Sequence, residues 1–191
     1  MAAPVRRRLV EALNKEMFVA VTRRFPGDAT HSGFIRELDA SLVVVEKFHD
    51  FYSEGFSLLR IDDIDAIRQR PGDDLFARII KADELSRADA LQSVMDEDGI
   101  RGALARIQSR YGLAAIHCET GDPNEDEYIL GEISAITADD ILVWVLGPEA
   151  QWELDVDTIA IADITQVEFA TPYAETLARH APPSPSGRQY E

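Results

Sequence analysis

The sequence predicts a mainly β protein of the α+β class, with two five-stranded, strongly bent β-barrels that are each preceded by a helix and joined by a helical linker. Two observations predict this fold. Residues 33–67 have an imperfect second copy at residues 131–167, and an internal repeat usually marks a repeated structural unit. Both copies alternate apolar and polar residues with the period of two that is typical of half-buried strands, and β-branched residues are frequent.

The repeat is defined by a glycine-led strand, an apolar run and a final I-x-D-I-x-x-I/V pattern, with one residue gained in the turn before the second apolar run. The alternative is two ordinary β-meanders with similar turn chemistry. The matched stretches are Gly33-Phe34-Ile35 with Gly131-Glu132-Ile133, Leu38 with Ile136, 42–45 with 141–144, and 61–67 with 161–167.

Each predicted element follows from periodicity and from the turn residues around it. Glycines inside strand patterns mark bends, and short bent strands favour closure into barrels. Pro-Gly and Asp-rich stretches mark loops. The predicted helices are 5–15, 75–82, 87–95 and 100–111, and the predicted strands are 17–22, 31–38, 42–48, 55–60, 64–68, 113–116, 128–136, 141–146, 151–157 and 164–169.

These elements divide the chain into four predicted segments. Residues 1–70 form the first barrel, 71–99 the helical linker, and 100–171 the second, acidic barrel. Residues 172–191 form a partly disordered tail, expected to fray after about Ala181 because its apolar content is low. The sequence has no apolar run long enough to cross a bilayer. A single cysteine, Cys118, predicts no internal disulfide and a reducing, cytoplasmic compartment.

The net charge of the chain is −16, and the charged residues are distributed unevenly along the sequence. Residues 1–70 carry eleven basic and eleven acidic side chains, whereas residues 113–170 carry fourteen acidic side chains and no Lys or Arg. Because polyanions are bound by Lys and Arg that displace counterions, the second copy is not expected to bind nucleic acid. DNA and membrane partners are not expected either.

The run GFIRELDASLVVV in residues 33–45 resembles the first Sm motif of the Sm-like family, and LLRIDDIDAI in residues 58–67 resembles its second. The resemblance implies a tandem pair of Sm-like barrels, edge-strand pairing into rings and binding of single-stranded RNA in a central pore. This sequence differs at the positions expected to contact RNA. Val43 and Leu142 stand where the family commonly has a polar residue, Ile61 replaces the glycine after Arg60, and Ala160-Ile161 replaces Arg-Gly.

No catalytic, phosphate-binding or metal-binding motif is present, so no cofactor and no metal site are predicted. His117 and Cys118 are adjacent on a predicted strand and would point to opposite faces, which makes joint chelation unfavourable. His49-Asp50 is either an acid–base pair or a polar hairpin tip, and the second interpretation is favoured. Asp39, Asp63 and Asp163 are interpreted as turn caps.

The sequence therefore favours a non-enzymatic interaction or scaffold module with a protein partner or self-association. One alternative is binding of single-stranded RNA by the first barrel, with the second barrel as ring partner. Another is an enzyme with a site between the copies, near His49 or His117. The RNA-binding hypothesis depends on seven arginines: Arg6, Arg7, Arg8, Arg23, Arg24, Arg36 and Arg60.

Overall fold

The computed structural model describes residues 2–25, 30–122 and 124–190. Met1 and Glu191, the ends of the first and last predicted segments, lie outside them. The helices are α1 (Ala2–Asn14), α2 (Asp73–Ala82), α3 (Ile100–Arg110) and α4 (Pro172–His180). The strands are β1 (Phe18–Arg23), β2 (Thr30–Leu38), β3 (Leu42–His49), β4 (Tyr52–Arg60), β5 (Ile64–Arg68), β6 (Leu113–Cys118), β7 (Glu127–Ile136), β8 (Asp140–Leu146), β9 (Trp152–Ala160) and β10 (Gln166–Phe169).

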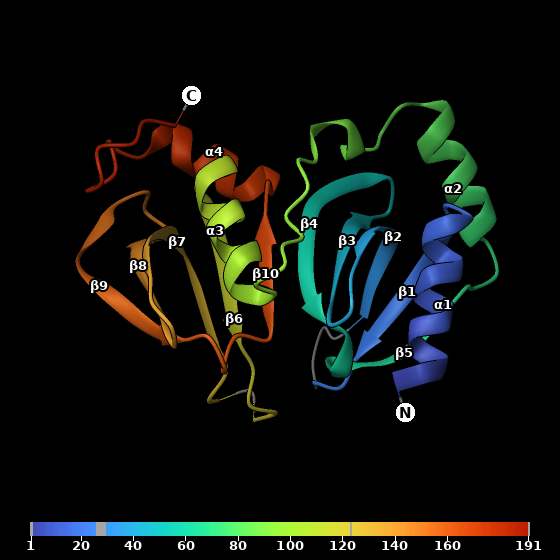
Figure 1. The fold of residues 1–191 in the computed structure, drawn as a ribbon. Coiled ribbons are helices and arrows are strands. Elements are labelled where there is room, and N and C mark those ends of the chain that lie inside the picture. The colour runs from blue at the N-terminus through green and yellow to red at the C-terminus, as the bar shows by residue number, and fades with distance from the viewer. Residues whose placement is uncertain (1, 26–29, 123, 191) are drawn as a thin grey trace.

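The prediction of two separate barrels is wrong. In the described part of the chain, all ten strands form one open antiparallel sheet in the order β5-β1-β2-β3-β4-β10-β6-β7-β8-β9. The reason is that β10 uses both of its hydrogen-bonding edges, one with β6 and one with β4. Figure 1 shows the result as two lobes that meet where β4 lies beside β10. We call residues 2–82 the first half, 83–99 the connector and 100–190 the second half.

The same bend occurs at corresponding places in the two halves. Gly33 lies opposite Val19, and the β2–β3 register shifts two residues after this glycine, at Ile35. Gly131 lies opposite Ala114, and the β7–β8 register shifts after Ile133. Each glycine lets the next strand approach closely, because a Cβ would lie 1.8 Å from Glu46 O at Gly33 and 2.2 Å from Trp144 O at Gly131.

Strand pairing changes the alignment of the apolar runs. Val43 lies opposite Leu38, and Ile141 lies opposite Ile136. Val43 therefore corresponds to Ile141, whereas the sequence comparison had matched Leu42 with Ile141. The extra length lies in the next hairpin, between β8 and β9, and the turn between β7 and β8 gains no residue.

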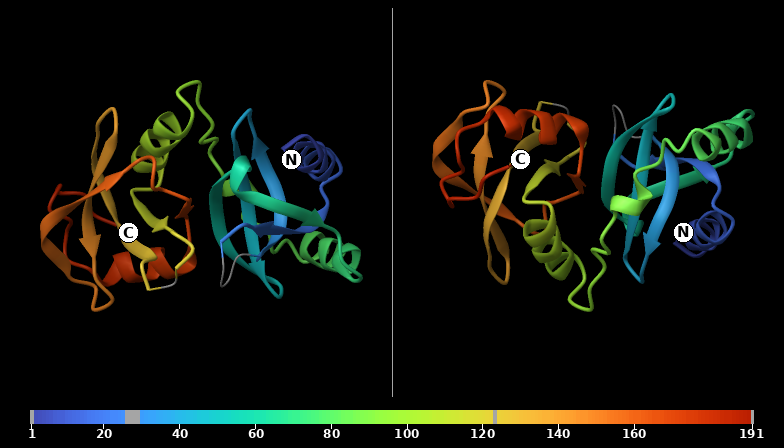
Figure 2. Two further views of the ribbon diagram at one scale, coloured as in Figure 1. Left: turned by 90° about the horizontal axis from the view of Figure 1, so that it is seen from below. Right: turned by 90° about the horizontal axis from the view of Figure 1, so that it is seen from above.

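Each half has one helix before its strands and one after them, and Figure 2 shows the two helices on opposite sides of each lobe. The helix that precedes the strands buries an apolar stripe, with Leu9 of α1 and Leu104 of α3 fully enclosed. The helix that follows packs on the other face of the strands. Ile80 of α2 lies against Phe18, and Ala178 of α4 lies in the cluster around Leu113. The structure thus places α2 with the first half, although the sequence assigned it to the linker.

Of the predicted helix at 87–95, the structure forms a single 3-10 turn, Ala88–Ala90. Two carboxylates of the first half, the buried Glu46 and the half-buried Glu37, accept hydrogen bonds from backbone amides of this stretch. Glu46, which is fully buried, accepts from Arg87 N at 2.6 Å. Glu37 Oε2 accepts from Val94 N at 3.0 Å. The connector therefore follows the surface of the first half.

Residues 172–190 are folded against the second half. Thr171 caps α4 by accepting from Ala174 N at 3.1 Å. Beyond the helix, Trp152 Nε1 donates to Pro182 O at 2.8 Å, and the Tyr190 hydroxyl donates to the buried Glu132 at 2.9 Å. No helix in the described ranges has the length and apolar character needed to cross a membrane.

Candidate functional site

The structure places five of the seven predicted RNA-binding arginines in contacts within the chain. Arg6 donates to the Asp39 and Ala40 carbonyls, and Arg60 donates to the Ile161 and Ile164 carbonyls of the second half. Arg23, Arg24 and Arg36 form ion pairs with Glu119, Asp63 and Glu46. Arg7 and Arg8 are exposed on α1 and form no ion pair with the described residues. RNA binding stays a prediction. Of the seven arginines, Arg23 and Arg24 lie over the same Phe25 ring, 4.9 and 5.2 Å from its centroid.

The three predicted turn caps differ in their contacts. Asp39 Oδ1 accepts from Ser41 N and Leu42 N, both at 2.7 Å, and so closes the β2–β3 turn. Asp63 is buried and pairs through Oδ1 with Arg24 at 2.8 Å, and burial raises the pKa of its carboxyl. Asp163 is exposed, and no hydrogen bond of its side chain occurs among the described residues.

A polar cluster joins the halves on the face of the sheet where β4 meets β10. At its centre, Gln166 of β10 accepts from Arg23 Nη1 at 2.5 Å and lies 3.0 Å from His31 Nε2. Its amide nitrogen donates to Glu168 Oε1 at 2.7 Å and to Ser57 Oγ at 3.3 Å. Because all of these groups except Glu168 are almost completely buried, the cluster fixes one register between the halves.

Burial and neighbouring charges together set the pKa values of His31 and Glu168 in this cluster. Burial, together with the positive charges of Lys47 and Arg23, lowers the pKa of His31 to about 3, so the ring is neutral at pH 7. Burial would raise the pKa of Glu168, but His117 and Lys47 overcome it and lower the pKa to about 2. Lys47 donates directly to Glu168. Arg23 pairs with Glu119, and Lys47 pairs with Glu168, so we assign the cluster a structural role.

The candidate enzymatic residues are dispersed. His117 is half-buried with Nε2 3.7 Å from Glu168, whereas Cys118 is buried on the other face of β6. Burial raises the pKa of the Cys118 thiol to about 11, which makes it unreactive. His49 is exposed at the β3–β4 hairpin. Within the described ranges, no group of three or more His, Cys, Asp or Glu side chains could hold a metal ion.

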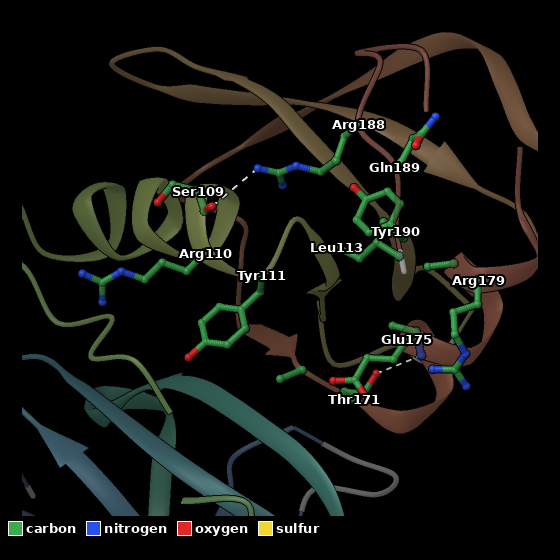
Figure 3. A pocket seen from close by; sticks show the side chains of 13 residues that line it. Ser109, Arg110, Tyr111, Leu113, Thr171, Glu175, Arg179, Arg188, Gln189 and Tyr190 are labelled. Atoms are coloured by element: carbon green, nitrogen blue, oxygen red, sulfur yellow. Dashed lines mark hydrogen bonds between the residues drawn. The ribbon is translucent and has the colours of Figure 1, made fainter. Parts of the chain in front are cut away.

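A cavity of about 430 Å³ lies in the second half, between the end of α3, α4 and the C-terminal segment. Figure 3 shows the rings of Tyr111 and Tyr190 and the guanidinium groups of Arg179 and Arg188 around it. No sequence motif marks this site, because its residues come from three segments that meet only in the folded chain.

The two ends of the sheet are the second feature with functional potential. β5 pairs only with β1, and β9 pairs only with β8, in the part of the chain that the structure describes. β9 is unusually exposed for a strand, and Leu154, its third residue, has 95% of its surface exposed. Unpaired strand edges bind further strands readily.

No protein-family model, curated protein or solved structure matches this chain. The junction residues His31, Lys47, Gln166 and Glu168 were not identified from the sequence. A signal was present, because Gln166 and Glu168 alternate with Val167 and Phe169. That alternation indicates a strand with one polar face, but it does not indicate which strand that face meets.

Proposed function

We propose that the chain is a self-associating interaction module in which β9 of one copy pairs with β5 of the next. One observation carries this proposal. Inside the chain, the fourth strand of the first half, β4, pairs with the last strand of the second half, β10. The strands left at the ends of the sheet are the fourth strand of the second half, β9, and the last strand of the first half, β5. The same pairing between copies would therefore use the two free edges.

The internal pairing supplies a register for the proposed one. Ser57 of β4 lies opposite Val45, and Asp157 of β9 occupies the same place opposite Val143. Ala20 of β1 and Ala115 of β6 are equivalent positions in the two halves. Arg68 of β5 lies opposite Ala20, and Glu168 of β10 lies opposite Ala115, so Arg68 is the equivalent of Glu168. Because Ser57 lies opposite Glu168 within the chain, Asp157 would lie opposite Arg68 between copies. An opposite-charge pair across two strands is favourable.

Charge and exposure support association between these unlike edges. The β9 edge carries the exposed residues Glu153, Asp155 and Asp157, together with the apolar Leu154. The β5 side carries the exposed Arg68 and, on the adjoining α1, the exposed Arg7 and Arg8. Complementary charge of this kind steers association and selects its orientation. A contact between two different surfaces closes into a ring or continues as an open chain of copies.

We further propose that the two halves are tandem copies of an Sm-like unit. The support is the shared order of helix, five strands and helix, with the bend and register shift at corresponding glycines. Edge-strand pairing is also how Sm-like proteins form rings. Each chain contains two such units, which are already joined by the pairing of β10 with β4. A ring would therefore contain half as many chains as Sm-like units.

Charge reversal tests the proposed pairing. Light scattering with measured mass, over a range of concentrations at low salt, is expected to show oligomers for the unmodified chain. Asp157→Lys and Arg68→Glu are each expected to shift the chain toward monomer, and the double variant is expected to restore association. Glu149→Lys, which makes the same charge change in the exposed β8–β9 turn, serves as the matched control. A chain that is monomeric at every concentration, or a double variant that fails to associate, would show the proposal to be wrong.

A further inference from the structure

The cavity in the second half is independent of the sheet edges. It lies beside the end of α3, and its floor is formed by the buried side chains of Leu113, Ala174 and Ala178. Its volume of about 430 Å³ falls within the range of roughly 300–1,000 Å³ that is typical of small-molecule sites.

Two tyrosine rings border this cavity, and their hydroxyl groups are held outside it (Figure 3). Tyr111 Oη donates to Gln92 O at 3.1 Å and accepts from Gln92 N at 2.7 Å. Tyr190 Oη donates to Glu132 at 2.9 Å, and its ring stacks on Trp152 with centroids 6.4 Å apart. The rings are therefore fixed in place, and they present apolar aromatic surface to the cavity.

The C-terminal segment fits closely against the end of α3. Gly112 has φ +79°, and a Cβ at this position would lie 2.5 Å from Arg188 Nη1 and 2.8 Å from Tyr190 Cε1. Arg188 also donates to Gln108 O at 2.8 Å. Tyr190 and Arg188 thus form one side of the cavity, and their contacts with the end of α3 hold them in position.

The rim of the cavity is positively charged. Neither Arg179 nor Arg188 has a carboxylate partner among the described residues, and the only side-chain hydrogen bond that Arg179 makes there is to Thr176 at 3.1 Å. The one carboxylate on the rim, Glu175, is neutralised by Arg87 through contacts of 2.7 and 2.9 Å. A guanidinium carries five N–H donors, so both arginines retain donors for an anion.

Arg179 is exposed and Arg188 is half-buried, and Arg188 differs from several other arginines that are at least half-buried. Arg23, Arg36 and Arg87 each meet a carboxylate. Between Leu113 and Ala170 the second half contains no basic residue and fourteen acidic ones. Three arginines line this cavity and form no ion pair with the described residues: Arg110, Arg179 and Arg188. They therefore make a local positive site on an acidic body.

We propose that this cavity binds a small aromatic phosphate of mononucleotide size. The aromatic body would lie on the apolar floor between Tyr111 and Tyr190, where stacking on a ring is favourable for any base. The phosphate would face Arg179, on the α4 side of the cavity (Figure 3), because guanidinium groups bind phosphate oxygens through charge-assisted hydrogen bonds.

Isothermal titration calorimetry with AMP and UMP tests this proposal on the full chain. Binding of at least one of them is expected, with affinity reduced about tenfold or more in Arg179→Gln. Tyr111→Leu is expected to reduce affinity as well, because it removes stacking surface. Arg101→Gln is the matched control, since Arg101 is on α3 but pairs with Asp98 and does not line the cavity. Circular dichroism of each variant checks that it is folded.

Two comparison ligands test the aromatic part and the phosphate part of the proposed site separately. Adenosine and inorganic phosphate are each expected to bind more weakly than AMP. Absence of nucleotide binding at millimolar concentration, binding unchanged by Arg179→Gln in a folded variant, or adenosine or phosphate binding as tightly as AMP would each overturn the proposal. Association through β5 and β9 is measured separately by light scattering, so failure of one proposal does not affect the other.

Discussion

Arg23 of β1 and Gln166 of β10 are 143 positions apart in the sequence and are joined by a hydrogen bond of 2.5 Å between Nη1 and Oε1. Arg23 also pairs with Glu119 and donates to Thr165 O at 3.3 Å. One side chain of the first half thus satisfies three polar groups of the second. The two halves are therefore expected to unfold together.

Arg23→Leu tests this connection. The guanidinium is almost completely enclosed, and its removal takes the only charged partner from Glu119 among the described residues and one donor from the buried Gln166. The expected loss in free energy of unfolding is about 3–5 kcal/mol, measured by urea denaturation. Arg7→Ala, on the exposed face of α1, is expected to change it by less than about 0.5 kcal/mol. A loss below 1 kcal/mol for Arg23→Leu, on the order of a surface substitution, would contradict the assignment.

Acid is expected to destabilise the junction through His31. Its pKa falls from 6.5 to about 3 on folding, so the unfolded chain binds a proton below pH 6.5 that the folded chain does not bind. Stability is therefore complete above pH 6.5 and falls toward pH 3, with a slope of about 1.4 kcal/mol per pH unit. His31→Gln keeps a polar group beside Gln166 and removes this slope. Urea unfolding at several values between pH 7.5 and 4.5 measures it, and an unchanged slope in the variant would disprove the role of His31.

Glu168 adds a second acid-sensitive step. Its pKa falls from 4.5 to about 2 on folding, so its contribution is complete above pH 4.5 and is lost as the pH falls toward 2. Glu168→Gln is expected to reduce stability at pH 7, because Lys47 loses its negative partner. The difference between the variant and the unmodified chain should shrink as the pH falls from 4.5 to 2, and a constant difference would argue against this pairing.

Gly33→Ala and Gly131→Ala are expected to be strongly destabilising. A Cβ at either position would overlap a carbonyl oxygen of the neighbouring strand, Glu46 O or Trp144 O. Backbone cannot move away without breaking the strand pairing, so a loss of about 3 kcal/mol or more is expected in urea denaturation. Gly147→Ala is the control, because its nearest neighbour, Gln151 O, would be 3.5 Å away. Equal effects at all three glycines would be inconsistent with the close approach.

Cys118 is expected to react slowly with thiol reagents in the folded chain. Burial, with the nearby Glu127, raises the pKa of its thiol from 9.0 to about 11. The thiolate fraction at pH 8 is then reduced about 100-fold, and only the thiolate reacts. Labelling with a chromogenic disulfide should be at least that much slower in buffer than in denaturing urea. Similar rates in the two conditions would contradict a buried thiol.

The strands could be predicted from the sequence because their alternation is a local property. The predicted first half places β5 at its observed bounds and β1 within one residue. The helix α4 was missed although its signal is local too. Thr171 and Pro172 form a typical helix start, whereas the low apolar content of the tail predicts disorder.

The remaining features depend on contacts between residues distant in sequence. Nothing in the sequence of β10 indicates that its second edge pairs with β4, so separate barrels were expected where one sheet formed. Glu46, inside a run of apolar residues, reads as a solvent-facing position, but it is buried and binds the connector. Likewise, the cavity beside Tyr111 and Tyr190 forms only when the C-terminal segment has folded back.

The pairing of β4 with β10 has a consequence for biosynthesis. β4 ends at Arg60 and β10 ends at Phe169, so 109 residues are made after β4 before its edge can be covered. At about 5–20 residues per second, a ribosome leaves this edge open for several seconds. The nascent first half is therefore a candidate client for chaperones that shield unpaired strands, and stalled translation inside the second half is expected to yield an aggregation-prone fragment.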